Sequence, residues 1–290
     1  MKHDRSLLGI IFMIAGTFSL GTNDILVKSL TFKFPIWEIV FFRALSGVII
    51  SIFLLMIFGY SKIKTKKPLA HLIRAFSSAG CVVLFFFGIK FLLLSENQAI
   101  FHTAPIIASL LAIPILGEKF GYNRIFAILI GFIGTLIILK PGTNLFNIYS
   151  LIPLASAFFM AIAYLATRYL MTTESSIAII FYYSVALLIT SLVFFPSNYI
   201  MPTLLELIPL SLIGVIGSLG HYFLSLAAKN AEVTVIAPFE YSSFIFVTFL
   251  AYIFYNEIPD LSIYIGAVFI IISGIYIVFR EQKNKKNKLI

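Results

Sequence analysis

Long apolar stretches alternate with short polar segments along the whole chain. A helix needs about 20 apolar residues to cross a bilayer, and on that measure the pattern predicts ten membrane-spanning helices. We place them at residues 7–27, 36–58, 70–89, 97–116, 124–139, 150–170, 177–195, 207–227, 233–255 and 262–279. The connections between them are too short to hold a soluble domain, so the predicted fold class is an all-α membrane protein.

The second half of the chain repeats the first at a nearly constant offset. At 140 residues the aligned pairs are Lys28-Ser29-Leu30 with Arg168-Tyr169-Leu170, Phe42 with Tyr182, Ser78-Ala79-Gly80 with Ser218-Leu219-Gly220, and Gly134 with Gly274. At 139 residues, Gly117-Glu118 aligns with Asn256-Glu257. Each half then holds five spans, an odd number, so the second half must enter the membrane from the opposite side.

This pattern predicts two inverted five-helix repeats, at residues 1–140 and 141–279, followed by a basic cytoplasmic tail at 280–290. Inverted repeats are typical of secondary transporters, which bind substrate near the bilayer midplane between the two halves. Some channels also use them, so a channel is the alternative of a different class.

Composition and charge agree with a membrane protein and predict its orientation. Hydrophobic residues make up 60% of the chain and charged residues 11%, against about 25% charged residues in soluble domains. With the N-terminus in the cytoplasm, sixteen Lys and Arg fall on the cytoplasmic side and four on the other. The positive-inside rule therefore predicts that both termini are cytoplasmic, and the net charge of +9 needs no nucleic-acid partner.

Polar and small residues recur at helical spacing on four of the predicted spans. The stripes are Arg74, Ser78, Cys81 and Phe85; Gln98, His102, Pro105, Ser109 and Ala112; Ser211, Gly214, Ser218, His221 and Ser225; and Thr234, Pro238, Tyr241, Ile245, Thr248 and Tyr252. Small residues alone are explained by helix packing. The larger groups His102, His221 and Tyr241 favour a polar cavity, because buried hydrogen-bonding groups need partners.

Charged residues inside the spans leave several interpretations open. Asp24 and Arg43 could form a structural ion pair between helices or contact substrate, and Glu38 is a second candidate partner of Arg43. Glu240 could face the cavity edge or pair with a cation on a neighbouring helix. Two further carboxylates, Glu118 and Glu257, end their spans at equivalent positions, and we expect both at the membrane surface, outside the site.

Six stretches together resemble the drug/metabolite transporter superfamily, in its EamA group, over nearly the whole chain. They are Asn23–Leu30 (NDILVKSL), Phe41–Gly47 (FFRALSG), Ala104–Glu118 (APIIASLLAIPILGE), Gly131–Gly142 (GFIGTLIILKPG), Ala237–Tyr241 (APFEY) and Asn256–Asp260 (NEIPD). The resemblance is greatest to S-adenosylmethionine uptake carriers, which differ in having a basic residue at the position of Glu240, and then to riboflavin carriers. It implies ten helices in the bacterial inner membrane, around a central cavity lined by spans three, four, eight and nine with contributions from spans one and six.

The sequence thus favours a secondary transporter of a small organic metabolite that works by alternating access. Its substrate is expected to be amino-acid-like or cationic, such as S-adenosylmethionine, with riboflavin or an amino acid as alternatives. We predict the substrate-binding residues His102, His221, Tyr241, Glu240, Tyr222, Phe85, Phe86, Gln98, Ser218, Asp24 and Arg43. A coupling ion or exchanged metabolite could take part, and the sequence does not indicate an oligomeric state.

An enzyme is disfavoured because no constellation of nucleophile, base and metal ligands is present. The sequence contains no Walker A loop, which disfavours an ATP-driven pump. We expect no cofactor and no metal. The single cysteine, Cys81, excludes an intramolecular disulfide framework.

Overall fold

The computed structural model describes residues 2–116, 122–143, 146–170, 174–231 and 233–286, and every regular element in these ranges is helical. The α-helices are α1 (Lys2–Thr31), α2 (Ile36–Phe58), α3 (Pro68–Phe91), α4 (Leu94–Phe101), α5 (Ala104–Leu116), α6 (Tyr122–Leu139), α7 (Leu151–Leu170), α8 (Ser176–Val193), α9 (Leu204–Asn230), α10 (Val233–Glu240), α11 (Ser242–Tyr255) and α12 (Leu261–Lys286). Two 3-10 helices, η1 (Tyr60–Ile63) and η2 (Ile148–Ser150), precede α3 and α7.

The apolar helices of the described residues fall into two length classes. Five segments are long and apolar enough to cross a bilayer: Leu7–Thr31, Ile36–Phe58, Pro68–Phe91, Ile148–Thr167 and Leu204–Leu224. Shorter apolar helices cover Ile125–Leu139, Ile177–Val193, Ser242–Tyr255 and Leu261–Ile277. The all-α fold class is therefore confirmed, whereas the number of ten crossings stays a prediction.

The fourth predicted span, at 97–116, is not one continuous helix. It is divided into α4 and α5 at His102 and Thr103. Pro105 explains the break, because proline lacks an N–H and its ring clashes with the carbonyl four residues earlier, here that of Phe101. The Thr103 hydroxyl donates to Ile100 O at 2.7 Å, and Ile107 N donates to Thr103 O at 3.0 Å, so Thr103 ends one helix and begins the next.

The ninth predicted span, at 233–255, is divided in the same way at Tyr241, between α10 and α11. Pro238 removes a backbone donor inside α10, and the helix ends two residues later. Two serine hydroxyls donate to the last carbonyl groups of α10. Ser242 Oγ donates to Phe239 O at 2.6 Å, and Ser243 Oγ donates to Glu240 O at 3.0 Å, which satisfies carbonyls that lack a helical partner.

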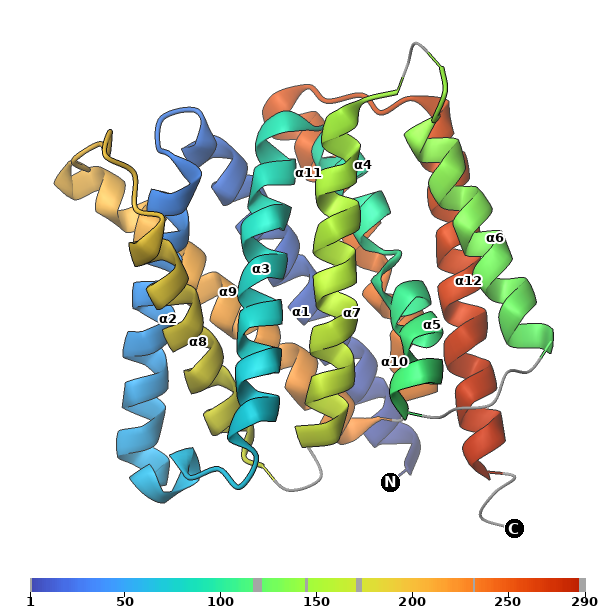
Figure 1. Cartoon of the computed structure of the whole chain (residues 1–290), viewed down its shortest axis with the longest axis horizontal. Coiled ribbons are helices and arrows are strands. Elements are labelled where there is room, and N and C mark those ends of the chain that lie inside the picture. Colours follow the sequence, from blue (N-terminus) through green and yellow to red (C-terminus); the bar gives the residue numbers. More distant parts are fainter. Residues whose placement is uncertain (1, 117–121, 144–145, 171–173, 232, 287–290) are drawn as a thin grey trace.

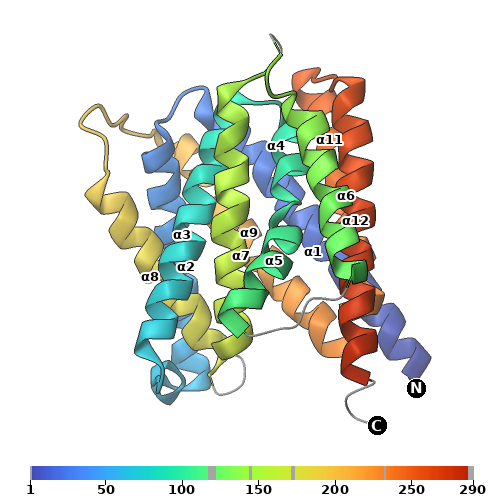
Figure 2. The ribbon, with the colours of Figure 1, turned by 45° about the vertical axis from the view of Figure 1, so that its right-hand side comes forward.

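The helices contact one another in matching sets. The α1–α9 contact corresponds to the α7–α3 contact five spans later, and the α2–α9 contact corresponds to the α8–α3 contact. Helix α1 meets both α10 and α11, as α7 meets both α4 and α5. The pairs α2–α8 and α6–α12 each join a helix to its own counterpart, and Figure 2 shows α6 beside α12 at one edge of the bundle.

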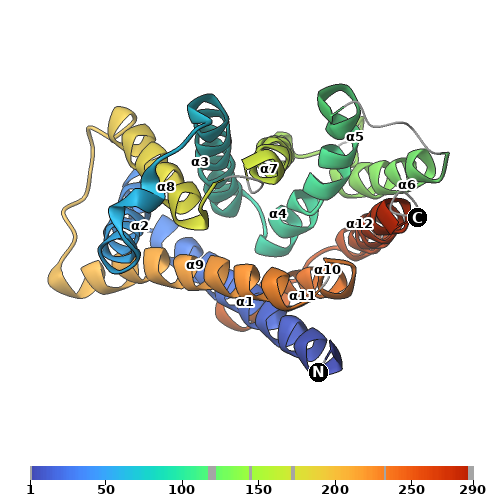
Figure 3. The same ribbon diagram turned by 90° about the horizontal axis from the view of Figure 1, so that it is seen from below.

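Helices α1 and α7 run in opposite directions through the bundle (Figure 1). We call the end where α1 begins and α12 ends the terminal end, and the opposite one, where α1 leads into α2, the far end. Helices α5 and α10 lie toward the terminal end, and α4 and α11 lie toward the far end. Seen along the bundle, α4 lies between α7 and α11 (Figure 3).

Glycines allow the closest of these contacts. A Cβ atom built on Gly16 of α1 would fall 3.1 Å from the carbonyl oxygen of Gly220 in α9, and one on Gly134 of α6 would fall 2.7 Å from that of Gly266 in α12. Small residues let membrane helices approach until their backbones touch. These contacts fix the relative positions of helices that carry the polar groups described next.

Candidate functional site

The two helix breaks meet in the interior of the bundle. The ring of His102, at the first break, lies 5.0 Å from the ring of Tyr241, at the second, measured between centroids. These residues are 139 positions apart, which is the repeat offset in this part of the chain. A residue can touch its own repeat counterpart only close to the axis that relates the halves, so the contact marks where the two halves meet.

Ser243 links both breaks through one hydroxyl group. It lies 3.0 Å from His102 Nε2 and accepts a hydrogen bond from Gln98 Nε2 at 3.1 Å. Its own proton is directed to Glu240 O, so the arrangement is satisfied when His102 carries a proton on Nε2. The side-chain oxygen of Gln98 is buried and has no hydrogen-bond partner among the described residues, which leaves one acceptor for an N–H or O–H group.

The two residues at the end of α10 point to different neighbours. The hydroxyl of Tyr241 packs against Gly274 of α12, where an added Cβ would fall 1.7 Å from it. The carboxylate of Glu240 accepts a hydrogen bond from the Tyr164 hydroxyl of α7 at 3.4 Å. Glu240 is half-buried and Tyr164 is 39% exposed, although both belong to helices in the middle of the bundle. A carboxylate with one weak partner is available to a ligand.

Arg43 of α2 lies on the other side of this region. Its NH1 group donates to Asn23 Oδ1 at 3.0 Å and to Ile213 O at 3.4 Å, and the guanidinium stands 5.4 Å from the ring centre of Phe86. A Cβ on Gly217 of α9 would fall 2.6 Å from NH1, so glycine there makes room for the arginine. The polar partner is Asn23, rather than the Asp24 or Glu38 that the sequence offered.

A second guanidinium, that of Arg74 near the start of α3, lies toward the terminal end of the bundle (Figure 1). Its Nε donates to Thr167 Oγ1 at 3.2 Å and its NH1 donates to Ile179 O at 3.0 Å. It also stands 5.6 Å from the ring centre of Tyr183. His221 of α9 is exposed and feels the positive charge of both Arg43 and Arg74.

Apart from Tyr222, the remaining predicted site residues divide into three groups. Asp24 is 9% exposed and interacts with Arg43 only through space. Phe85 packs edge-on against Phe101 at 4.8 Å, and Phe85 and Phe86 are 9% and 2% exposed, so neither presents a free ring face. Ser218 donates within its own helix to Gly214 O at 2.7 Å.

Tyr222 is the one predicted residue that the structure does not bring into this region. It is 57% exposed, and its ring lies 6.2 Å from that of Phe223. Three residues that the prediction omitted belong there instead: Tyr164, Ser243 and Arg74. The repeat offset carries a signal for the first of them, because Tyr164 lies 140 positions after Asp24. Arg74 belongs to the polar stripe of the third span, which was a signal for it, and Ser243 lies two positions after Tyr241 of the ninth-span stripe.

The described residues contain no group of three or more His, Cys, Asp and Glu side chains placed to hold a metal ion. The side chains of the site are hydrogen-bonding and charged groups. Carboxylates come from α1 and α10, guanidinium groups from α2 and α3, and imidazoles from α9 and the α4–α5 break. Such a set can hold a polar ligand with both signs of charge.

Comparison with known proteins finds matches along nearly the whole chain. The model of the EamA-like transporter family matches twice, at residues 7–140 and 147–280. An S-adenosylmethionine uptake transporter of Rickettsia bellii is 27% identical over 282 residues, which is 97% of each chain. A pseudopaline exporter of Pseudomonas aeruginosa is 28% identical over 277 residues, covering 95% of this chain and 97% of the exporter. A crystal structure with 17% identity superposes with a TM-score of 0.63 over 95% of this chain and 96% of that one, which supports the fold alone.

Proposed function

The chain belongs to the EamA-like transporter family, and from that premise we propose that it carries an amino-acid-like or cationic metabolite, such as S-adenosylmethionine, across the bacterial inner membrane. The observation that supports this substrate class is the mixed charge of the site. Arg43 and Arg74 carry positive charge on helices α2 and α3, while the Glu240 carboxylate has a single weak partner in Tyr164. Separate cationic and anionic contacts suit a zwitterion.

Each charge of such a substrate has a plausible contact. An α-carboxylate would bind on the side of His221, Arg43 and Arg74, because guanidinium groups bind carboxylates with charge-assisted hydrogen bonds. A sulfonium or ammonium group would lie near Glu240, where Tyr164 adds an aromatic face. The free oxygen of Gln98 would accept an N–H group. The names of two relatives, an S-adenosylmethionine uptake transporter and a pseudopaline exporter, agree with a small organic substrate and leave the direction of transport open.

Riboflavin fits this site less well. Its flat ring system calls for stacking, and the two phenylalanines that the sequence offered for that purpose are buried against Phe101 and Arg43. A neutral substrate would also leave the Glu240 carboxylate without a counter-charge, which is costly inside a membrane protein.

Alternating access is the proposed mechanism. The two family matches start 140 residues apart, and the opposite directions of α1 and α7 (Figure 1) support two inverted repeats that rock against each other around the site. We propose ten crossings, with the split helices α4–α5 and α10–α11 counted once each, and both termini in the cytoplasm. Broken helices are tolerated at membrane depth where they line a polar cavity.

Counter-flow in proteoliposomes tests the proposal. Vesicles loaded with unlabelled S-adenosylmethionine should take up labelled S-adenosylmethionine against its gradient, and saturably. S-adenosylhomocysteine, which lacks the sulfonium charge, should compete less well, and Glu240→Gln should reduce that difference. A flux without saturation or counter-flow would favour a channel. Failure of every amino-acid-like and cationic compound, with counter-flow of riboflavin, would overturn the substrate class.

A further inference from the structure

The contacts between the two split helices are unequal at the two ends of the bundle. At the far end, α4 packs against α11. The repeat counterpart of that contact would join α10 to α5 at the terminal end, and no comparable contact joins those helices among the described residues. Several other contacts also lack a counterpart, but this one joins the two split helices, and in the described part of the chain it makes the far end the more closely packed of the two.

The turn between α11 and α12 supplies the polar contacts that fasten the far end. Asn256 ends α11 with a positive φ of 52°, a conformation that asparagine tolerates better than most residues. It places Tyr255 and Glu257 on the side of the turn that faces α1 and α4. The Tyr255 hydroxyl donates to Ile25 O of α1 at 2.6 Å, which is the first connection between the turn and α1.

Glu257 makes the remaining connections through both of its oxygens. Lys28 of α1 donates to Oε1, and the backbone N–H of Leu94, at the start of α4, donates to Oε2 at 2.8 Å. Lys28 also donates to Leu92 O, just before α4, at 3.0 Å. The side chains of Lys28 and Glu257 are 12% and 8% exposed. Glu257 follows the C-cap residue of α11 directly, as we expected from the sequence, and its side chain is buried there by these contacts.

A carboxylate is well suited to this position for two reasons. The N-terminus of α4 carries partial positive charge on its free N–H groups, and Lys28 adds a full one. One side chain thus holds α1, α4 and the α11–α12 turn together. The counterpart Glu118, at the end of the fourth span, lies outside the described residues.

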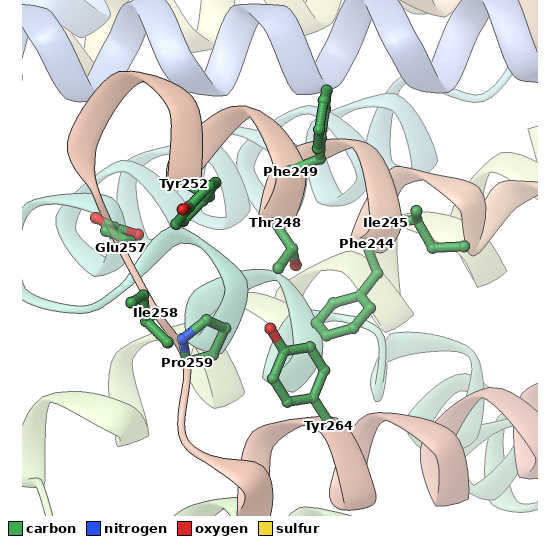
Figure 4. Close-up of a pocket in the computed structure, with 9 residues that line it drawn as sticks. All are labelled: Phe244, Ile245, Thr248, Phe249, Tyr252, Glu257, Ile258, Pro259 and Tyr264. Carbon is green, nitrogen blue, oxygen red and sulfur yellow. The ribbon is translucent and has the colours of Figure 1, made fainter.

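Helix α11 has room to move away from α4 and toward α12. A groove of about 500 Å³ separates it from α12, and Figure 4 shows Thr248 directed into that space, with Glu257 at one end and Tyr264 of α12 opposite. The two helices meet in the described residues at the Phe244–Tyr264 ring contact, with centroids 6.5 Å apart. If α11 left α4, its exposed aromatic side chains would fill this groove.

We propose that Glu257 is the residue that holds the far end closed, and that α11 alternates between a seat on α1 and α4 and a seat in the groove on α12. The inference rests on the alternating access of the proposed function and adds the residues that control it. Loss of the Glu257 contacts shifts the population toward a far-end-open state, and filling the groove shifts it back.

Thiol accessibility measures this equilibrium without any substrate. Ser95 in the first turn of α4 is 1% exposed and its hydroxyl has no partner among the described residues, so Ser95→Cys in a Cys81→Ala chain is a suitable reporter. A membrane-impermeant maleimide is applied to each face of the membrane in turn. From the far-end face, labelling should rise by about tenfold in Glu257→Gln, the change expected when the closed state loses roughly 1.4 kcal/mol.

Two further variants separate gating from damage to the fold. Thr248→Trp, which fills the groove, should lower labelling below that of the reporter chain and should reverse the rise caused by Glu257→Gln. Glu206→Gln breaks the exposed Lys33–Glu206 ion pair, which joins the α1–α2 turn to α9 rather than to α4 or α11, and should leave labelling unchanged.

Equal labelling of the reporter and the Glu257→Gln variant would overturn the inference. So would a rise that Thr248→Trp fails to reverse, since that result indicates unfolding. If labelling changes as expected while S-adenosylmethionine shows no counter-flow, the gate stands and the substrate proposal falls. If counter-flow works and labelling does not change, the substrate proposal stands and the gate falls.

Discussion

The two split helices share a backbone design and differ in the side chains at their breaks. Each is interrupted near a proline, and each presents a ring at the interruption, His102 in the first and Tyr241 in the second. The difference extends along the neighbouring helices, where Asp24 corresponds to Tyr164 and Cys81 corresponds to His221. The repeat therefore builds a symmetric frame, while the chemistry inside it is asymmetric, as recognition of an asymmetric molecule requires.

The two guanidinium groups show the same relation. Arg43 on α2 faces glycines of α9, including Gly214 and Gly217, and the counterpart of Gly214 is Arg74. The counterpart of Arg43 is Tyr183, which lies beneath Arg74. Each of the two equivalent helix contacts thus holds one arginine, contributed by opposite partners. Substitutions that affect one member of a related pair, and not the other, test whether this asymmetry matters for transport.

The largest effect is expected at Gly274. A Cβ there would lie 1.7 Å from the Tyr241 hydroxyl and 2.8 Å from its ring carbon, so Gly274→Ala must displace the tyrosine from the helix break. We expect loss of transport and a drop in thermal stability of about 1–3 kcal/mol, the usual range for overpacking. Thermal unfolding of purified protein and counter-flow measure both.

A rescue variant identifies the cause. Tyr241→Phe removes the clashing hydroxyl, so the double variant Tyr241→Phe/Gly274→Ala should recover part of the stability lost in Gly274→Ala. Additive losses in the double variant would contradict the contact between these residues.

Removal of Arg43 and removal of Arg74 should differ in their effects on stability and on uptake. Arg43 is 8% exposed and donates to the buried Asn23 Oδ1. Arg43→Met leaves that acceptor without its donor, at a cost of about 1–3 kcal/mol, whereas the Ile213 carbonyl still accepts from Asn23 Nδ2. Arg74→Met should lower uptake with a smaller loss of stability. The comparison requires unfolding midpoints beside initial uptake rates, and equal stability losses would refute this distinction.

Ser243 can be replaced by the residue at the equivalent position of the first half, which is Ala104 at an offset of 139. Ser243→Ala gives the second half the residue of the first. The amide of Gln98 and the ring of His102 then lose their shared acceptor, and we expect destabilisation by roughly 1–3 kcal/mol. A matched control is Ser242→Ala, which loses the bond to Phe239 O and one to Thr17, but none to the split helix α4.

Much of this arrangement follows from the sequence, and the parts that do not have identifiable reasons. Apolar run lengths predicted the helices, and helical spacing put Gln98 and His102 on one face of the fourth span. The contact between His102 and Tyr241, which lie on different spans, is seen only in the structure. The breaks were harder to predict, because a proline within an apolar run can either kink a membrane helix or end it. Partner choice was the least predictable, as Arg43 shows, because Asn23 and Asp24 are adjacent and only the rotation of α1 decides which one faces the arginine.

The smallest expected effect concerns the terminal end, where Glu174 has a role that resembles that of Glu257 at the far end. It accepts from Lys66 N at 3.2 Å and contacts His71 Nε2 at 3.4 Å, which ties the segment before α8 to the start of α3. Partial burial acts to raise the pKa of Glu174, but hydrogen bonds from Lys66, Thr65 and His71 outweigh it, and the pKa lies below its ordinary 4.5.

A carboxyl whose pKa is lowered by folding stabilises the folded state when it is ionised. The contribution of Glu174 is therefore complete above its ordinary value of 4.5 and is lost as the pH falls through its lowered folded value. Unfolding temperatures measured from neutral to acidic pH should fall less steeply for Glu174→Gln than for the parent chain. Parallel curves would show that Glu174 does not couple this end of the bundle to pH, and the resemblance to Glu257 would then be one of position alone.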